Sequence, residues 1–263
     1  MAKVIEIDDP ADARLDDFRD LSTADRRPDR PGGRGLVIAE GVVVVERLLA
    51  SPYPVRGLLG VRRRIEALDL SDLDVPAYVT SAEVMASVVG FHLNRGVLAA
   101  AGRAPAVPFE ELADRSTRLA VLEGVGDHEN LGSIFRNAAA LGVDGVVLGP
   151  GCSDPLYRRS VRVSMGHVLR VPFATTEEWP AALNILRHKG FTVAALTPRP
   201  TALHLADANL RGRRVAVLLG SEGPGLTDEA IDAADLAVRI PMSSGVDSLN
   251  VATAGAVAFY ALL

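Results

Sequence analysis

Residues 118–150 read RLAVLEGVGDHENLGSIFRNAAALGVDGVVLGP, and this stretch decides the fold. Two short apolar runs, Leu119–Glu123 and Gly145–Leu148, have the length of buried strands, and a helical pattern near Leu131–Leu141 separates them. A strand, a helix and a second strand in immediate succession predict two parallel strands joined by a crossover helix. Parallel strands covered by helices on both faces form an α/β fold.

The same alternation continues to the end of the chain. Further apolar runs of strand length occur at Phe191–Leu196, Val215–Leu219 and Leu236–Ile240. Helical patterns separate or follow them near Glu177–His188, Asp228–Ala234 and Leu249–Leu263. We therefore predict that residues 117–263 form one α/β domain with a parallel sheet.

The first part of the chain predicts a second, smaller α/β unit. Strand and helix patterns alternate at Val42–Leu49 (helix), Val55–Val61 (strand), Ser81–Val89 (helix) and Gly96–Ala101 (strand). Residues 1–35 are polar and interrupted by proline and glycine, which is typical of a loosely ordered arm. Residues 102–118 are charged and contain two prolines, so we place the boundary between residues 1–105 and the α/β domain there.

Composition narrows the functional class. No apolar run in the 263 residues approaches the ~18 that a membrane span needs, and the N-terminus lacks the pattern of a secretory signal. Cys152 is the only cysteine, which excludes an intrachain disulfide and fits a reducing cytoplasm. The five histidines show no ligand-like spacing, so we expect no metal site. Because no apolar run is long enough to span a membrane, we also expect no membrane partner.

The net charge and the arginine content of the chain favour opposite conclusions about nucleic-acid binding. A formal net charge of -5 does not suggest a nucleic-acid-binding protein. However, all but two of the 28 basic residues are arginine, whose planar fork of donors suits phosphate. Three arginine clusters stand out: Arg26, Arg27, Arg30 and Arg34; Arg62, Arg63 and Arg64; and Arg158, Arg159 and Arg162. An ordinary solvated surface explains each cluster equally well.

Three segments that follow predicted strands are rich in glycine and polar residues: 123–137, 219–226 and 240–251. In parallel α/β sheets, ligands bind beyond the carboxyl ends of the strands. The first segment is not a dinucleotide-binding loop, because Glu129 stands where a third small residue is needed. No Gly-Lys-Ser/Thr sequence exists either, which argues against nucleoside triphosphate hydrolysis.

The second segment suits a flat ligand. Without Cβ atoms at Gly220, Gly223 and Gly225, the backbone can approach an adenine ring closely and adopt positive φ. The second and third segments hold no basic residue, which fits S-adenosylmethionine because that cofactor carries a sulfonium cation and no phosphate. Ordinary glycine turns are the alternative interpretation.

Together, the three segments resemble the three motifs of the SpoU (TrmH-like) branch of the SPOUT RNA methyltransferases. The similar sequences are ENLGSIFRNAAALG (129–142), LLGSEGPGL (218–226) and IPMSSGVDSLNVATAGAVAFY (240–260), and their order and spacing agree from Arg118 to the C-terminus. Upstream, VIAEGVVVVERLLAS (37–51) and HLNRGVLA (92–99) resemble the small ribosomal-protein-like RNA-binding domain of many members.

The resemblance implies a C-terminal α/β domain whose last segment forms a deep trefoil knot. Without the resemblance we would not expect a knot, because knots are almost absent from proteins. It also implies a homodimer with its active site near the subunit interface. The implied reaction is methylation of a ribose 2′-hydroxyl in ribosomal RNA, or in transfer RNA, by S-adenosylmethionine. Residues 1–105 would bind the RNA substrate.

The resemblance also assigns residues. The positions that match its cofactor-binding residues are Gly220, Ile240 and Leu249, with Leu196, Thr197 and Met242 as neighbouring contacts. The positions that match its catalytic polar residues are Arg136, Asn130, Glu222, Ser248 and Asn250. Many members have proline at position 128 and threonine at position 137, where this chain has His128 and Asn137.

Each polar residue also has a structural interpretation. Asn130 and Ser248 would cap the helices that follow them, Glu222 would order a glycine turn, and Arg136 would lie along the surface. For the whole chain, the alternatives are a non-catalytic RNA-binding protein and a methyltransferase that acts on a base. Because guanidinium stays protonated, we expect Arg136 to bind the adjacent phosphate and stabilise developing negative charge rather than accept the proton.

Overall fold

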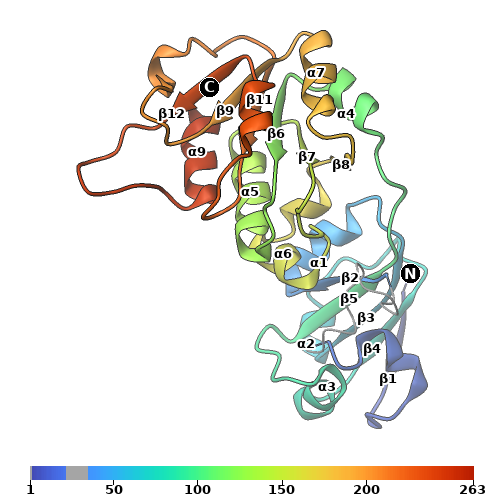
Figure 1. Cartoon of the computed structure of the whole chain (residues 1–263). Helices are drawn as coiled ribbons and strands as arrows, with labels where there is room; N and C mark the ends of the chain where they lie inside the picture. Colours follow the sequence, from blue (N-terminus) through green and yellow to red (C-terminus); the bar gives the residue numbers. More distant parts are fainter. Residues whose placement is uncertain (1, 22–34) are drawn as a thin grey trace. The chain divides into compact units, whose positions relative to one another are not determined.

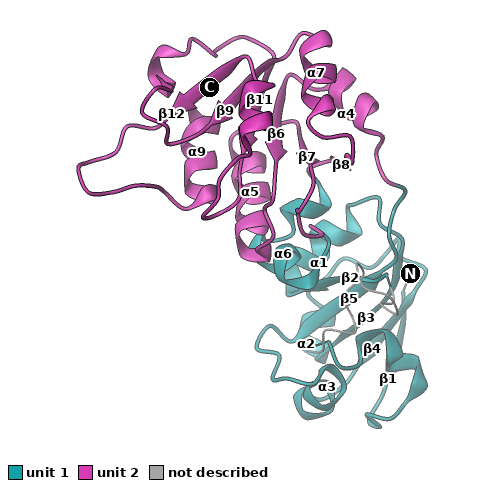
Figure 2. Cartoon of the chain, viewed as in Figure 1, with its two compact units in different colours: residues 1–105, 156–170 teal, residues 106–155, 171–263 magenta. Residues whose placement is uncertain are grey.

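The structure is a computed structural model that describes residues 2–21 and 35–263 (Figure 1). The chain divides into two units, each with its own sheet (Figure 2). Unit 1 comprises residues 1–105 and 156–170, and unit 2 comprises residues 106–155 and 171–263.

Unit 2 contains a seven-stranded sheet in which every neighbouring pair is parallel. The strand order is β10-β12-β9-β11-β6-β7-β8. The strands are β6 (Arg118–Leu122), β7 (Gly145–Leu148), β8 (Phe173–Thr175), β9 (Thr192–Leu196), β10 (Leu203–His204), β11 (Val215–Leu219) and β12 (Leu236–Arg239). The chain adds β7 and β8 on one side of β6 and then returns to the other side, so the order reverses at β6. The predicted parallel α/β sheet is confirmed.

Helices cover both faces of this sheet. They are α4 (Phe109–Arg115), α5 (His128–Ala140), α7 (Ala181–His188), α8 (Asp228–Asp232) and α9 (Val251–Ala261), with a 3-10 turn η4 (Leu205–Asp207). On one face, α4, α7 and α8 contribute Leu112, Leu183 and Ala230 to a core that includes Val121 and Leu218. On the other face, α5 and α9 lie side by side (Figure 1).

The starts of α5 and α9 correct two expectations. Asp127, not Asn130, caps α5. Its carboxylate accepts hydrogen bonds from the backbone N–H groups of Glu129 and Asn130, each with a donor–acceptor distance of 2.8 Å. Asn250, not Ser248, caps α9 by accepting from the N–H groups two and three residues on, over 3.0 and 3.2 Å. Asp and Asn are both strong capping residues, and sequence alone does not choose among several nearby candidates.

Unit 1 contains a five-stranded mixed sheet in the order β1-β4-β3-β5-β2. Strands β1, β4 and β3 are parallel, whereas β5 runs antiparallel to β3 and β2. The strands are β1 (Lys3–Glu6), β2 (Val37–Glu40), β3 (Val55–Gly60), β4 (Pro76–Val79) and β5 (Val97–Ala101). The helices are η1 (Ala13–Phe18), α1 (Val42–Leu49), α2 (Arg62–Ile65), α3 (Ala82–Val89), α6 (Arg158–Val163) and η3 (His167–Leu169).

The prediction of a loosely ordered arm is wrong for residues 2–21. Strand β1 pairs with β4, and η1 buries Leu15 and Phe18 in the core beneath the sheet. The strand and the 3-10 helix are short and contain few apolar residues. Their sequences therefore show no clear periodic pattern. Residues 22–34, with the first arginine cluster, lie outside the described residues.

The expected boundary at residues 102–118 also contains structure. Its charged stretch forms helix α4, whose Leu112 and Ala113 are buried against the sheet of unit 2. The charged side chains that suggested a linker are those of a helix with one solvent-exposed face.

Residues 156–170 pack within unit 1, although they connect two strands of unit 2. Arg158 forms an ion pair with the buried Glu40 over 3.3 Å and stacks on the Phe91 ring, 4.7 Å from its centre. Burial lowers the pKa of Arg158. The third arginine cluster is therefore not simply a solvated surface, because its first member is part of the packing of unit 1.

Within residues 2–21 and 35–263, no helix is both long and apolar enough to span a membrane. The same part of the chain holds no group of three acidic, histidine or cysteine side chains suited to bind a metal ion.

Candidate functional site

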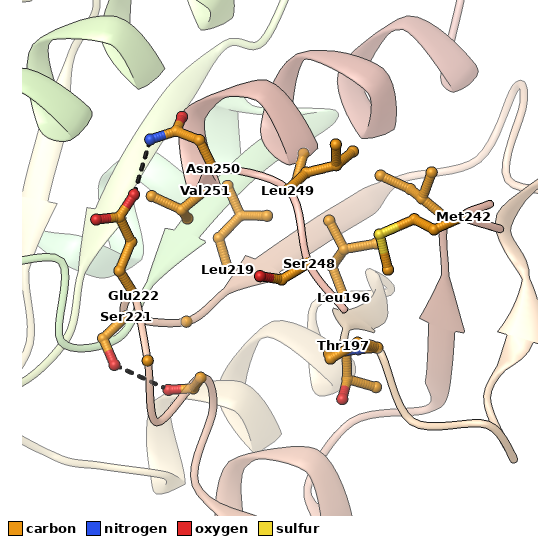
Figure 3. Close-up of a pocket in the computed structure, with 16 residues that line it drawn as sticks. Leu196, Thr197, Leu219, Ser221, Glu222, Met242, Ser248, Leu249, Asn250 and Val251 are labelled. Atoms are coloured by element: carbon orange, nitrogen blue, oxygen red, sulfur yellow. Dashed lines mark hydrogen bonds between the residues drawn. The ribbon is translucent and has the colours of Figure 1, made fainter. Parts of the chain in front are cut away.

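A cavity of about 450 Å³ opens at the carboxyl ends of β9, β11 and β12 (Figure 3). Such a volume is typical of small-molecule sites, and it lies where ligands bind in parallel α/β sheets. The three loops that follow these strands line it, with the start of α9. All six predicted cofactor-binding residues are among its lining: Leu196, Thr197, Gly220, Ile240, Met242 and Leu249.

The loop after β11 doubles back on itself. Gly220 lies so close to the far arm of the loop that a Cβ there would be 2.4 Å from the backbone of Gly225 and Leu226. Ser221 pairs with Gly225 and donates its hydroxyl to the Gly225 carbonyl over 3.2 Å (Figure 3). Gly223 and Gly225 have φ of +88° and +76°, which L side chains rarely adopt. The loop's own backbone therefore requires these glycines.

The cavity is mainly apolar. Leu196, Leu219, Ile240, Met242 and Leu249 form its walls, and Figure 3 shows several of these side chains pointing inward. Among the described residues that line it, Glu222 is the only one with a charged side chain. The site therefore has no cationic group for a phosphate, but it offers one carboxylate to a cation.

A polar network at the edge of the cavity joins the three motif segments. The Asn250 amide nitrogen donates to the Asn130 amide oxygen and to the Glu222 carboxylate, each over 2.7 Å. The Asn250 oxygen is occupied at the α9 cap, so the orientation of this amide is fixed. Among the described residues, the Asn130 amide NH2 group and the second Glu222 oxygen have no partner, so both remain available to a ligand, the first as a donor group and the second as an acceptor.

The remaining predicted catalytic residues are placed differently. Ser248 lines the cavity and is exposed. Arg136 is exposed on α5 and does not line the cavity, and it has no hydrogen bond or ion pair with any described residue. It lies six residues after Asn130, which is about 240° around the helix and ~9 Å along it. One chain alone therefore does not bring Arg136 into the Asn130–Glu222–Asn250 network.

Two residues of the site region escaped the sequence prediction. The Asn137 amide donates to the Ala252 carbonyl over 2.9 Å and so ties α5 to α9. Glu123 is a buried carboxylate that binds Trp179 and Thr227. An acidic residue directly after an apolar run was the available signal for Glu123, but its partners lie 56 and 104 residues away.

Comparisons with known proteins identify the family to which the chain belongs. The model of the SpoU rRNA Methylase family matches residues 117–260. A Mycobacterium tuberculosis protein named as an uncharacterized tRNA/rRNA methyltransferase is 57% identical over 261 residues, covering 98% of this chain and 91% of that protein. The 23S rRNA (guanosine(2553)-2'-O)-methyltransferase RlmP of Bacillus subtilis is 26% identical over 259 residues, covering 98% of each. The AdoMet-bound rRNA methyltransferase of Sinorhizobium meliloti has a similar fold, with a TM-score of 0.82, 23% identity and coverage of 98% and 97%.

Proposed function

This chain belongs to the SpoU rRNA methylase family, and from that premise we propose that it transfers a methyl group from S-adenosylmethionine to a ribose 2′-hydroxyl in RNA. The observation that carries the proposal is the cavity that all three motif segments line or border, with the Asn130–Glu222–Asn250 network at its edge. The similarity to RlmP, whose name describes a 2′-O-methyltransferase of 23S rRNA, favours ribosomal RNA, with transfer RNA as the second candidate.

The lining of the cavity fits the cofactor. S-Adenosylmethionine has an apolar adenine face and a sulfonium cation, and the cavity combines apolar walls with a single carboxylate. Gly220, Ile240 and Leu249 would hold the adenine, with Leu196, Thr197 and Met242 as neighbouring contacts. When bound, the cofactor supplies an electrophilic methyl group on sulfur. No metal takes part in this proposal.

The chain's own polar residues would position the acceptor. The available donor of Asn130 and the available acceptor of Glu222 suit the hydroxyl groups of a ribose, and Ser248 adds a hydroxyl at the cavity. Aligning the reacting groups can supply ~7–11 kcal/mol of the barrier. Arg136 would bind the adjacent phosphate and stabilise charge that develops on the attacking oxygen. Its guanidinium stays protonated throughout.

We also propose that the protein is a homodimer. What supports this is the outer face of α9, where Val257 and Tyr260 are 40% and 65% exposed although they are large and apolar or aromatic. They border a groove of about 600 Å³ with Leu205, Leu210 and Pro241. Ile240 lines both this groove and the cofactor cavity, so a partner seated here would lie next to the active site. A partner chain would also provide a route for Arg136 to reach the substrate.

The knot implied by the family is part of the same proposal. Residues 241–250 run from β12 to α9 along the cavity, which the loops after β9 and β11 also line. Helix α9 then packs beside α5 (Figure 1). This route supports the passage of the C-terminal segment through a loop of the chain.

Residues 1–105 would bind the RNA substrate, in the cytoplasm where ribosomal and transfer RNA are modified. Arg63 and Arg64 on α2 are exposed, and Arg64 packs against Gly96 of the HLNRG segment. Exposed arginines offer groups that bind phosphate through their planar fork of donors, which suits contacts with the RNA backbone.

The test is in vitro methylation of ribosomal and transfer RNA with methyl-labelled S-adenosylmethionine, followed by alkaline hydrolysis. Alkaline cleavage needs a free 2′-hydroxyl, so ribose methylation should leave the label in alkali-resistant dinucleotides. Label in mononucleotides would instead identify a base methyltransferase. RNA binding without incorporated label on any RNA fraction would favour the non-catalytic alternative.

A further inference from the structure

Glu123, the residue after β6, carries a buried carboxylate that the proposed reaction does not use. It is 5% exposed. Among the described residues, the one other buried carboxylate is that of Glu40, which faces Arg158, whereas the described partners of the Glu123 side chain are uncharged. Burying an ionised group is costly unless hydrogen bonds compensate it, so this carboxylate must be held by well-placed donors.

Three donors surround it. Oε1 accepts from the Trp179 indole N–H over 2.6 Å and from the Thr227 hydroxyl over 2.8 Å. Oε2 accepts from the Thr227 backbone N–H over 2.9 Å. Hydrogen bonds to an ionised acceptor are about twice as strong as neutral ones. Two of the three fix the same residue, Thr227.

Thr227 is the residue at which the loop 220–226 ends, and Leu219 is the residue before it begins. The backbone N–H of Glu123 donates to the Leu219 carbonyl over 2.9 Å. One residue therefore holds both ends of the loop, the entry through its backbone and the exit through its carboxylate. The following residue, Gly124, also contacts the loop, since a Cβ there would lie 3.1 Å from the Ser221 Cβ.

We propose that Glu123 is a positioning residue that sets the shape of the loop 220–226 and thereby the affinity for the cofactor. The loop provides Gly220 and Glu222 to the cavity, but its internal bonds join only Ser221 to Gly225. Among the described contacts, Glu123 joins both ends of the loop to the end of β6. The Asn250–Glu222 hydrogen bond and the burial of Leu226 hold other parts of the loop. The inference rests on the proposed function for the identity of the ligand, but not for the effect on the loop.

The test is Glu123→Gln, which keeps the size of the side chain. Glutamine has one acceptor oxygen, and its NH2 group would face an N–H or O–H donor that now binds the carboxylate. If the binding-competent loop falls to about a tenth of the population, the apparent Kd for S-adenosylmethionine rises about tenfold. Calorimetry measures this Kd, and hydrogen exchange of residues 220–227 without ligand should be faster. Glu40→Gln is the matched control, because it removes the other buried carboxylate and should leave both readouts unchanged.

A purely structural carboxylate would give a different result. If Glu123→Gln lowers the Tm while exchange at 220–227 and the Kd stay at wild-type values, the positioning role is wrong. If the wild-type protein does not bind S-adenosylmethionine, the cofactor assignment fails, but the exchange comparison still decides the role of Glu123. If the variant does not fold, Thr227→Val removes the hydroxyl that donates to Glu123 and keeps a side chain of the same size. Unchanged exchange at 220–227 in that variant would overturn the proposal.

Discussion

The side chains of Asn250 and Glu222 share a hydrogen bond of 2.7 Å in which the amide donates and the carboxylate accepts. The same Asn250 caps α9 through its oxygen, so one side chain serves the end of a helix and the edge of the cavity at once. These two roles use different atoms and can be separated by substitution.

Asn250→Asp is expected to abolish the donor role while it preserves the cap. An aspartate oxygen accepts from the first N–H groups of α9 as well as asparagine does, but the second oxygen would face the Glu222 carboxylate. We expect the single-turnover rate of methyl transfer to fall about a hundredfold or more, as for the loss of a positioned donor. The Tm at pH 7 should change far less than in Asn250→Ala, which loses both roles.

A compensating change sharpens this prediction. In the double variant Asn250→Asp with Glu222→Gln, the glutamine amide can donate to the new aspartate and restore the pair in reverse. If Glu222 acts only by orienting Asn250, the double variant should recover much of the lost rate. Failure to recover would assign the free Glu222 oxygen to substrate binding instead.

Gly220→Ala should eliminate cofactor binding without a bulky side chain. Its Cβ would lie 2.4 Å from the backbone of Gly225 and Leu226, which must move. Gly126→Ala is the control, since its nearest neighbour, the Gly151 carbonyl, is at an ordinary 3.7 Å. Calorimetry with S-adenosylmethionine should show no binding in the first variant and wild-type affinity in the second. Equal affinity in both would show that the loop tolerates the displacement.

Arg136→Ala should lower methyl transfer by about 10²–10⁴-fold, as for a major contact in the transition state. Cofactor affinity should stay unchanged, because Arg136 does not line the cavity. Arg136→Lys should restore only part of the rate, since an ammonium lacks the planar fork. Single-turnover rates across pH decide the role: a lysine variant that regains full activity only at high pH would favour proton abstraction.

Arg63 and Arg64 are the better test of RNA binding than removal of residues 1–105. Residues 156–170 pack against residues 1–105, so removal of residues 1–105 would leave them without their packing partners. This change alone would disturb folding. The double alanine variant should reduce the slope of log K against log salt by about 1.4–1.8, if each arginine contacts one phosphate. Arg213→Ala, which removes one exposed arginine from unit 2, is the comparison. An unchanged slope would exclude α2 from the RNA interface.

Asp144 should stabilise the protein at neutral pH. Burial opposes its ionisation, but hydrogen bonds from the N–H of Arg118 and from the N–H and hydroxyl of Thr117 outweigh burial and lower its pKa below 3.8. Because the folded pKa is the lower one, this stabilisation is complete above the unfolded value and is lost as pH falls through the folded value. Asp144→Asn should lower the Tm at pH 7, and the difference should shrink below pH 4.

Asp72→Asn serves as the control for that pH series. Asp72 is exposed, and its side chain has no hydrogen bond or ion pair with another described residue. Its replacement removes a carboxylate and no hydrogen bond, so the Tm at pH 7 should change less than in Asp144→Asn.

The sequence predicted the sheet of unit 2 well because its strands are buried on both faces. Runs such as Val215–Leu219 are continuously apolar, and their bounds agree with the structure. The short edge strands were missed: β10 has two residues and β8 has three, too few for a pattern to emerge. Unit 1 was predicted less completely. Lys3–Glu6 has only two apolar residues, is mostly exposed, and forms a strand by pairing with β4.

The candidate site was predicted as a set of residues but not as a set of bonds. All six residues that the resemblance assigns to the cofactor line the cavity. The motifs did not indicate that Asn250 would hold Asn130 and Glu222 together, since these residues are 120 and 28 positions away. The resemblance grouped Arg136 with Asn130, but a spacing of six residues places the two side chains on different sides of α5.

The excursion of residues 156–170 has a consequence for how this protein could have diversified. The chain passes from one unit to the other after Pro105, after Pro155 and after Arg170. Unit 1 is therefore not a contiguous cassette that recombination could exchange in one piece. Arg158 on α6 pairs with Glu40 and stacks on Phe91, both of which belong to residues 1–105. A chimera that replaces residues 1–105 alone would combine the present α6 with another protein's residues at these two positions. A functional replacement of unit 1 would therefore have to exchange residues 1–105 and 156–170 together.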